Sequence, residues 1–315
     1  MKFPVKGFLF GLSSTLLWAS VYPISRLLML SGSEELPPLP LTWVRLAISS
    51  MVVIPLMCLN GSGKQMTTAL KCDWKMLIVL ALLGNVLEGY LLLSGLSMTT
   101  AARASLMANA SPIFTVIIAF LLLHEKVRWS RWIGMVIGFA GIAWTIWGGG
   151  GSDCFGSVGL RGIVGDLLAL GSGICWAAFT VCGTGVSNRH GGGVAAILAI
   201  AFASVILLPF MFIVPGSWMA LYTLNWQGWL VVLYLSLMAN AVANIFWYKA
   251  LKELSPGALG AFGYISATIS ALMSVIILQE KITVQFVISL LLVVGAVALM
   301  MHQGQNSSDP DKSVL

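Results

Sequence analysis

The residues with the clearest chemical potential in this sequence are polar side chains that interrupt long apolar runs. Glu88 is the only acidic residue in the middle of such a run, and Asn85 lies three residues before it, on the same face of a helix. A carboxylate in this setting indicates either proton coupling and amine binding, or a neutral group hydrogen-bonded between helices. Both interpretations direct Glu88 toward a cavity or a neighbouring helix.

A second polar stripe lies late in the chain. Asn240 and Asn244 are one helical turn apart, and Trp247 continues their face. Such a stripe can hydrogen-bond an ammonium or a carboxylate and stack an apolar side chain; hydrogen bonding between helices is the alternative. Trp18 and Tyr22 also share a face, at a depth where aromatic belts are not expected. They indicate either the wall of a pocket or ordinary packing.

The elements that carry these residues are long apolar helices. Of 315 residues, 58% are hydrophobic and 9% are charged, with a mean hydropathy of +0.95, whereas soluble domains carry about a quarter charged residues. A helix needs about 20 apolar residues to cross a bilayer. The sequence therefore predicts an all-α polytopic membrane protein with ten transmembrane helices, over residues 7–30, 38–59, 73–98, 101–123, 129–148, 161–186, 191–214, 226–250, 256–278 and 282–302.

The basic residues predict the orientation. The first apolar run continues to Leu30, too long for a cleaved signal core, and so indicates an uncleaved helix. With a cytoplasmic N-terminus, 12 of the 17 basic residues fall on the inner side and 5 on the outer side. This bias is typical of cytoplasmic loops. We expect a multi-pass protein of the inner (plasma) membrane with both termini in the cytoplasm.

Several function classes find no support in the sequence. The five Cys form no CxxC motif, the three His are scattered, and the Gly-rich stretch Gly148–Gly151 lacks the Lys-Ser/Thr of a phosphate-binding loop. No converging set of Ser/His or paired Asp indicates an enzyme. We therefore expect no cofactor and no metal. The net charge of +6 suits an anionic lipid leaflet and gives no reason to expect nucleic acid binding.

Polar landmarks recur between the two halves of the chain. A shift of 155 residues lays Asn85 on Asn240, Asn109 on Tyr264 and Glu125-Lys126 on Glu280-Lys281; a shift of 158 lays Trp18 on Trp176. This predicts two five-helix repeats, residues 1–150 and 151–305, followed by a polar cytoplasmic tail, residues 306–315. Because five is odd, the repeats enter the membrane from opposite sides, an arrangement typical of transporters that hold substrate where the halves meet.

The candidate substrate-binding residues follow from these landmarks. They are the polar or aromatic groups expected near mid-depth: Trp18, Tyr22, Asn85, Glu88, Asn109, Trp176, Asn240, Asn244, Trp247 and Tyr264.

Other charged residues are interpreted as structural. We expect the Glu-Lys pairs to cap the turn between the fourth and fifth helix of each half. Arg26 and Arg45 are placed near outer helix ends, as anchors or as partners of Glu34 or Glu35; an inward Arg45 would favour an anionic cargo. Asp166 is expected at the positive end of the sixth helix.

The small-residue run Gly134–Gly141 predicts close helix contact. The partner helix can belong to the same chain or to a second copy, which leaves a homodimer open.

The chain also resembles the drug/metabolite transporter superfamily, in particular its ten-helix EamA-type members. The resemblance covers nearly everything from Gly7 to Met301. It is carried by "LLWASVYPISR" (Leu16–Arg26), "PLTWVRLAISS" (Pro40–Ser50), "TAARASLMANASPIFTVIIAFLLLHEKVRWSRWIGMVIGFAGI" (Thr100–Ile142), "GDLLALGSGICWA" (Gly165–Ala177) and "IILQEK" (Ile276–Lys281). The second half departs at Ala267, where the first has Pro112, so the two fourth-position helices are not expected to bend alike.

This resemblance implies a secondary carrier whose cavity is lined by the first, third and fourth helices of each half. Such carriers usually export small metabolites, and some relatives export amino acids. We therefore expect an exporter of a small amphipathic metabolite, working by alternating access, with amino acids as first candidates. Coupling to protons through Glu88 and uncoupled exchange both stay open. The alternatives within transporters are a nucleotide-sugar or nucleoside exchanger and a proton-coupled drug or cation efflux carrier.

Overall fold

The computed structural model describes residues 5–30, 36–123, 129–148, 159–253, 256–280 and 284–302. Within these ranges every regular element is helical, as expected for an apolar chain, because a helix satisfies its own backbone groups in lipid. Seven helical stretches are long and apolar enough to span a bilayer, and three shorter apolar helices, Trp132–Trp144, Ile265–Leu278 and Phe286–Ala296, fall on the other expected spans. The predicted fold class is confirmed.

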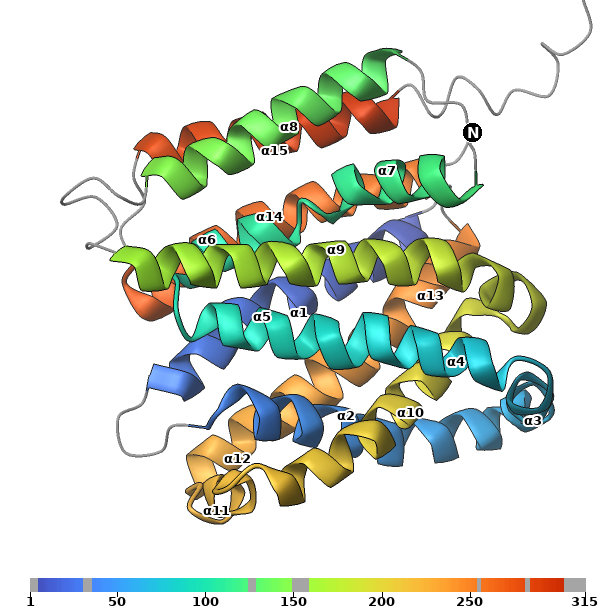
Figure 1. Ribbon diagram of the computed structural model, residues 1–315. Helices are drawn as coiled ribbons and strands as arrows, with labels where there is room; N and C mark the ends of the chain where they lie inside the picture. Colours follow the sequence, from blue (N-terminus) through green and yellow to red (C-terminus); the bar gives the residue numbers. More distant parts are fainter. Residues whose placement is uncertain are drawn as a thin grey trace, which may run out of the picture.

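The first half supplies the helices from blue to green in Figure 1. After α2 the helix is kinked at Gly61, whose φ of 82° is readily adopted only by glycine. The helices are α1 (Val5–Leu30), α2 (Pro38–Met57), α3 (Gly63–Cys72), α4 (Trp74–Ala81), α5 (Glu88–Leu96), α6 (Ala101–Ala108), α7 (Ser111–Leu123) and α8 (Trp129–Gly148).

The second half begins at the opposite end of the bundle. In Figure 1, α1 starts on the right, whereas α9 starts on the left, beside the end of α8. The helices are α9 (Gly159–His190), α10 (Gly192–Ile213), α11 (Ser217–Tyr222), α12 (Trp226–Leu233), α13 (Ala243–Glu253), α14 (Pro256–Leu278) and α15 (Val284–His302).

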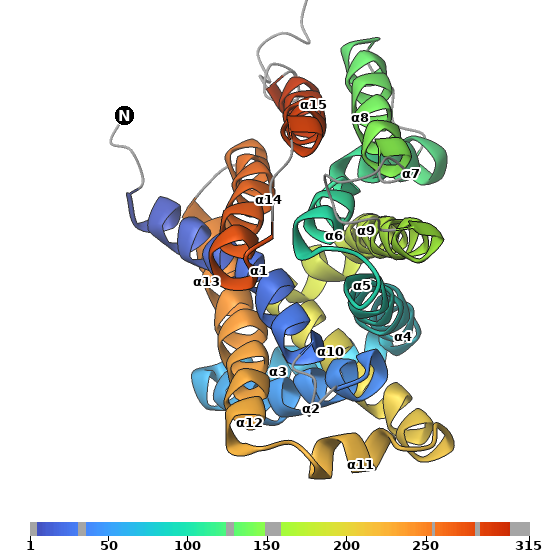
Figure 2. The same cartoon turned by 90° about the vertical axis from the view of Figure 1, so that its left-hand side faces the viewer.

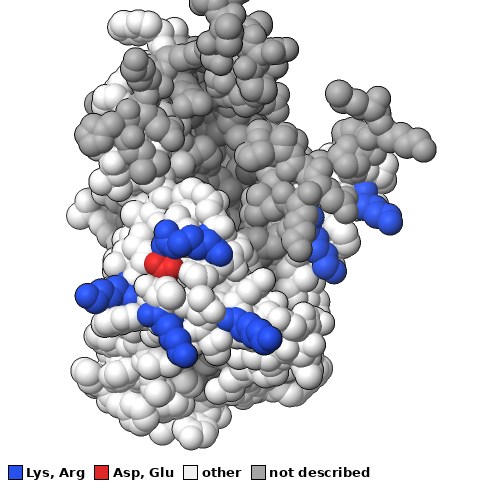
Figure 3. Space-filling view, turned by 90° about the vertical axis from the view of Figure 1, so that its right-hand side faces the viewer, with Lys and Arg blue, Asp and Glu red and all other residues white. Residues whose placement is uncertain are grey.

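The two ends of the bundle differ in charge. The right-hand end in Figure 1, here called the basic end, carries the exposed Lys6, Lys64, Lys71, Lys75, Arg189 and Lys249. Figure 3 shows that Lys and Arg dominate the charged groups on its described surface. The other end, where α8 ends and α9 begins, is here called the linker end.

The first helix of each half packs mainly against helices of the other half. α1 packs against α13 and α14, whereas α9 packs against α5 and α7. α2 pairs with α10, and α8 pairs with α15 in a layer at one edge of the molecule (Figures 1 and 2). The space between the halves is thus bordered by the first helix of each.

The small-residue run Gly134–Gly141 packs against other helices of the same chain. A Cβ on Gly138 would contact Ile113 and Ala296, and one on Gly141 would lie 3.0 Å from Leu292 Cβ. The run therefore serves the close approach of α8 to α15 and α7.

Two π-helical segments interrupt corresponding helices of the two halves. Leu82–Leu87 (η2) joins α4 to α5, and Tyr234–Val242 (η3) joins α12 to α13. They contain Asn85 and Asn240, which the 155-residue shift superposes. A π-helical turn widens the helix locally and is frequent at functional sites.

The fourth span of the first half is broken, whereas its counterpart is continuous. α6 ends at Ala108 and α7 starts at Ser111, followed by Pro112, which lacks an N–H and fits a first helical turn. In α14 Ala267 takes the equivalent position and the helix runs unbroken from Pro256 to Leu278. The expected difference in bending is present.

A buried ion pair ties α6 to α9. Arg103 and Asp166 are 1% and 0% exposed; Arg103 Nε lies 3.2 and 3.1 Å from the two carboxylate oxygens, and Nη2 also contacts Oδ2. The Thr99 hydroxyl donates to Asp166 Oδ1 at 2.7 Å. α9 begins at Gly159, two turns before Asp166, so this carboxylate neutralises Arg103 instead of the helix dipole, contrary to the sequence interpretation.

Candidate functional site

A cavity of about 550 Å³ lies between the two halves. Its wall comes from α1, α2, the η2–α5 helix, the α6–α7 break, α9, α10, the η3–α13 helix and α14. Nine of the ten candidate residues line it: Trp18, Tyr22, Asn85, Glu88, Asn109, Trp176, Asn240, Asn244 and Trp247. The side chain of the tenth, Tyr264, lies outside the described residues. The structure thus gathers the candidates; that they bind substrate stays a prediction.

Three tryptophans form one part of the wall. The Trp18 ring centroid lies 5.0 Å from that of Trp247 and 6.4 Å from that of Trp176, and Trp176 lies 5.2 Å from Phe179. Trp18 and Trp176, superposed by the repeat, meet here from α1 and α9. Such rings offer an apolar surface and can also attract a cation to their faces.

The side-chain amides that line the cavity differ in whether their N–H groups have hydrogen-bond partners. Asn109 Nδ2 donates to Tyr22 Oη at 3.3 Å and to the Ser105 carbonyl at 2.8 Å. Asn244 Nδ2 donates to the carbonyl of Asn240, within its own helix, at 2.6 Å. Asn240 Nδ2 is buried and has no partner among the described residues. It is therefore a donor available to a bound molecule.

Two opposite charges also line the cavity, Glu88 on α5 and Arg45 on α2. The two side chains make no salt bridge with each other, and Arg45 Nε is buried without a partner among the described residues. Because an unpaired buried charge is costly, this arrangement suits a site that receives a charged or polar ligand.

The inward position of Arg45 corrects the sequence interpretation, which placed it at an outer helix end as an anchor. Leu41 and Ser49, one turn to either side on the same face, are both fully buried. Arg45 therefore lies on the face of α2 that meets the bundle. The polar Thr42 and Ser49 on that face are the sequence signal that would have indicated it.

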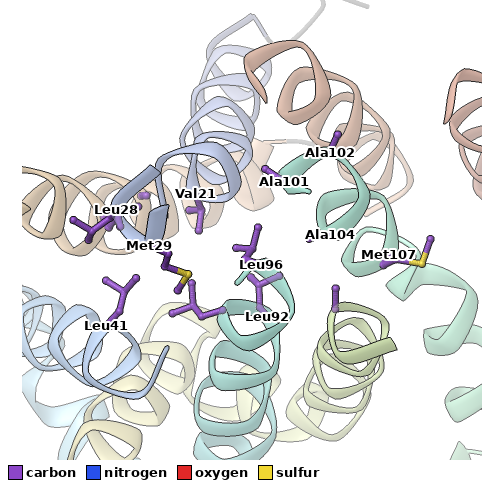
Figure 4. Packing of buried hydrophobic residues seen from close by; sticks show 14 of the residues in the cluster. Val21, Leu28, Met29, Leu41, Leu92, Leu96, Ala101, Ala102, Ala104 and Met107 are labelled. Carbon is purple, nitrogen blue, oxygen red and sulfur yellow. The ribbon is translucent and has the colours of Figure 1, made fainter. Parts of the chain in front are cut away.

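A layer of buried apolar side chains borders the cavity toward the linker end. Figure 4 shows Val21 and Met29 of α1 near Leu41, Leu92 and Leu96. Toward the basic end, the cavity is lined as far as Ser187 and Gly192, where α9 ends and α10 begins. The cavity therefore extends from the middle of the bundle toward the basic end.

A cluster of polar contacts, here called the linker-end cluster, joins the halves near this layer. Arg26 Nε lies 3.4 Å from Glu280 Oε1, and Arg26 Nη1 donates to the Leu96 carbonyl at 2.6 Å. Glu280 also accepts hydrogen bonds from the backbone N–H groups of Ala101 and Ala102, at 2.8 and 3.2 Å. One carboxylate of the second half thus caps α6 of the first half and pairs with α1.

The contacts of Glu280 differ from the role expected for it. Glu280 was expected to cap the turn after its own helix, and Arg26 to pair with Glu34 or Glu35, which lie outside the described residues. Glu125, Lys126 and Lys281 also lie outside them. Among the described residues, the acidic partner of Arg26 is the repeat landmark Glu280.

A second ion-pair cluster holds α9 at the basic end. Arg189 Nη2 donates to Asp73 Oδ1 at 2.7 Å, and His190 Nε2 lies 2.7 Å from Asp73 Oδ2. Arg189 and then His190, by these hydrogen bonds, hold the pKa of Asp73 below its usual range. This cluster connects the start of α4 to the end of α9.

Within the described part of the chain, no group of three or more His, Cys, Asp or Glu residues is placed to hold a metal ion. The chemistry of the cavity is thus that of a mixed surface: three tryptophans, several amides, a carboxylate and a guanidinium.

Known proteins resemble this chain over most of its length. The model of the EamA-like transporter family matches twice, over residues 5–147 and 163–302. An uncharacterized transporter of Archaeoglobus fulgidus is 26% identical over 267 residues, 84% of this chain and 87% of that protein. The uncharacterized inner membrane transporter YedA of Escherichia coli K12 is 28% identical over 280 residues, covering 86% and 81%. A crystal structure with 19% identity shares the fold, with a TM-score of 0.62 over 95% of this chain and 98% of that one.

Proposed function

We propose that this chain, which belongs to the EamA-like transporter family, is a secondary carrier that moves a small amphipathic metabolite across the inner membrane. The observation that carries the proposal is a cavity between the two halves, bordered by buried apolar side chains at one end and extended toward the other. A carrier that works by alternating access needs such a site, reachable from one side at a time.

The arrangement of the halves supports this mechanism. The two halves begin at opposite ends of the bundle (Figure 1), and their first helices both border the cavity. We interpret them as inverted repeats that rock around the cavity. Because basic residues gather at cytoplasmic ends of membrane helices, the basic end is the cytoplasmic end in this proposal. The cavity is then open toward the cytoplasm, and the direction of transport is export, as the family resemblance implies.

Amino acids are the first substrates to test, because the cavity combines charged groups, amides and a tryptophan surface. Efflux of organic cations is a second candidate. It is favoured by Glu88, which lines the same cavity as Trp18 and Trp247.

The direct test is uptake into proteoliposomes that contain the purified chain. Amino acids, nucleotides and lipophilic cations are offered with and without a pH gradient. Saturable uptake of one class, absent from protein-free liposomes, is the expected result. If no class enters faster than into protein-free liposomes, the proposal of a small-metabolite carrier fails.

Replacing Glu88 with Gln is expected to remove the response of transport to a pH gradient, because Gln cannot release and rebind a proton. Exchange of labelled for unlabelled substrate, which needs no net proton movement, should continue at saturating substrate. The measurement is substrate uptake with and without the gradient, followed by counterflow in the same vesicles. Asp73→Asn, which changes a carboxylate at the basic end, serves as the control. Retention of full pH dependence by the Glu88→Gln protein would remove Glu88 from the coupling role.

A further inference from the structure

We propose that Arg45 and Glu88 are the two charged poles of one binding site, and that the cargo must carry both an anionic and a cationic group. The inference rests on the proposed carrier function and narrows its substrate class to zwitterions. It is carried by the position of two opposite charges in one cavity that form no salt bridge with each other.

The two poles lie on neighbouring helices. α2 and α5 pack together, and a Cβ on Gly89 would lie 3.1 Å from Thr42 Cγ2. Arg45 is one turn along α2 from Thr42, and Glu88 directly precedes Gly89. Thr42, Arg45, Glu88 and Gly89 all line the cavity. The close approach at Gly89 therefore brings both charged side chains to one part of the wall.

Arg45 and Glu88 form no ion pair although their helices are neighbours. No salt bridge joins them, and no hydrogen bond from either side chain to another described residue is present. The contrast with the other ion pairs is clear, because Arg103–Asp166, Arg26–Glu280 and Arg189–Asp73 all close within hydrogen-bonding or ion-pair distance. Arg45 and Glu88 are thus the pair of opposite charges in the described bundle that both face the cavity and remain open to a ligand.

A zwitterion satisfies both poles at once. The guanidinium of Arg45 presents several N–H donors in a plane, which suits two oxygens of a carboxylate. The carboxylate of Glu88 accepts hydrogen bonds from an ammonium group. A cargo with one charge would leave the opposite pole buried and unpaired, and loss of one partner from such a pair is more costly than loss of both.

The rest of the wall fits the body of such a molecule. Trp18, Trp176 and Trp247 offer an apolar surface, and Asn240 Nδ2 is a free donor on the same cavity. The volume of about 550 Å³ falls within the range of small-molecule sites, which is about 300–1,000 Å³.

Binding to the purified full-length chain tests the proposal with three matched sets of probes. Each set contains a zwitterion, the amine left when its carboxylate is removed, and the acid left when its amino group is removed. The sets are leucine, 3-methylbutylamine and 4-methylpentanoate; phenylalanine, 2-phenylethylamine and 3-phenylpropanoate; and serine, ethanolamine and 3-hydroxypropanoate. Affinity is measured by calorimetry at one pH and one salt concentration.

In the wild type, at least one zwitterion should bind about tenfold or more tightly than both its analogues, the effect of a charge-assisted hydrogen bond. In Arg45→Gln the preference for that zwitterion over its amine should collapse toward unity, whereas the preference over its acid remains. In Glu88→Gln the reverse should hold. Each ratio is measured within one protein, so a general loss of folded material does not imitate the result.

Two results overturn the proposal. One is that no zwitterion binds more tightly than its amine and acid analogues. The other is that the preferences of the wild type survive unchanged in Arg45→Gln and Glu88→Gln. The outcome is separable from that of the carrier proposal: zwitterion binding without flux in proteoliposomes contradicts transport, whereas flux of a singly charged compound with no zwitterion preference contradicts only the two-pole site.

Discussion

Replacing Asp166 with Ala lowers the free energy of unfolding by about 3–5 kcal/mol, the range observed when one partner of a buried ion pair is removed. The reason is that Arg103 would then remain charged, 1% exposed and without its carboxylate. Thr99 would lose its acceptor as well. Reversible unfolding of the detergent-solubilised protein measures the change.

Two matched variants control this prediction. Asp73→Ala removes the acidic partner of an exposed pair at the basic end, and Arg189 there is 56% exposed, so the loss should be smaller. The double change Arg103→Met with Asp166→Leu removes both buried charges and should recover much of the stability lost in Asp166→Ala. A loss in Asp166→Ala no larger than that in Asp73→Ala contradicts the structural role assigned to the buried pair.

Replacing Glu280 with Ala is expected to open the cavity toward the linker end. The substitution removes the ion pair with Arg26 and two hydrogen bonds from the N-terminus of α6. Hydrogen bonds to a charged group contribute about 1.5–3 kcal/mol each. If these contacts form only while the linker end is closed, their loss should favour the opposite state about tenfold or more.

The measurement is the rate at which a cysteine in the cavity reacts with a membrane-impermeant thiol reagent. Thr180 lines the cavity and is exposed, so Thr180→Cys is the reporter, in a background without the five natural cysteines. Reagent added on the linker-end side should react at least about tenfold faster in Glu280→Ala than in the parent. Gln279→Ala, a change at the exposed neighbouring residue, should leave the rate unaltered. Equal rates in Glu280→Ala and the parent would mean that the linker-end cluster does not hold that end closed.

The sequence was sufficient for the spans and for most of the candidate site, because both depend on local pattern. Lipid requires continuous apolar helices, and a polar residue inside one must face away from lipid. Asn85, Asn240 and Trp176 were identified by this rule together with the repeat, and the cavity contains all of them.

The charged partners could not be predicted, because they depend on contacts between distant segments. Arg103 and Asp166 are 63 residues apart, and Arg26 and Glu280 belong to different halves. The distance of Arg45 from a helix end predicts a surface anchor, but the face of α2 on which it lies decides its environment, and that face meets the cavity. The π-helical segments at Asn85 and Asn240 leave no pattern in a single sequence.

The central claim, that cargo passes through the cavity between the halves, is tested most directly by blocking it. Flux in proteoliposomes is measured for the Thr180→Cys protein before and after complete modification by a bulky thiol reagent. A protein that retains only Cys58, which is exposed and does not line the cavity, is the control. If cargo passes through the cavity, modification abolishes flux in the first protein and spares the second, and excess substrate slows the modification of the first. Undiminished flux through a fully modified Thr180→Cys protein would contradict it.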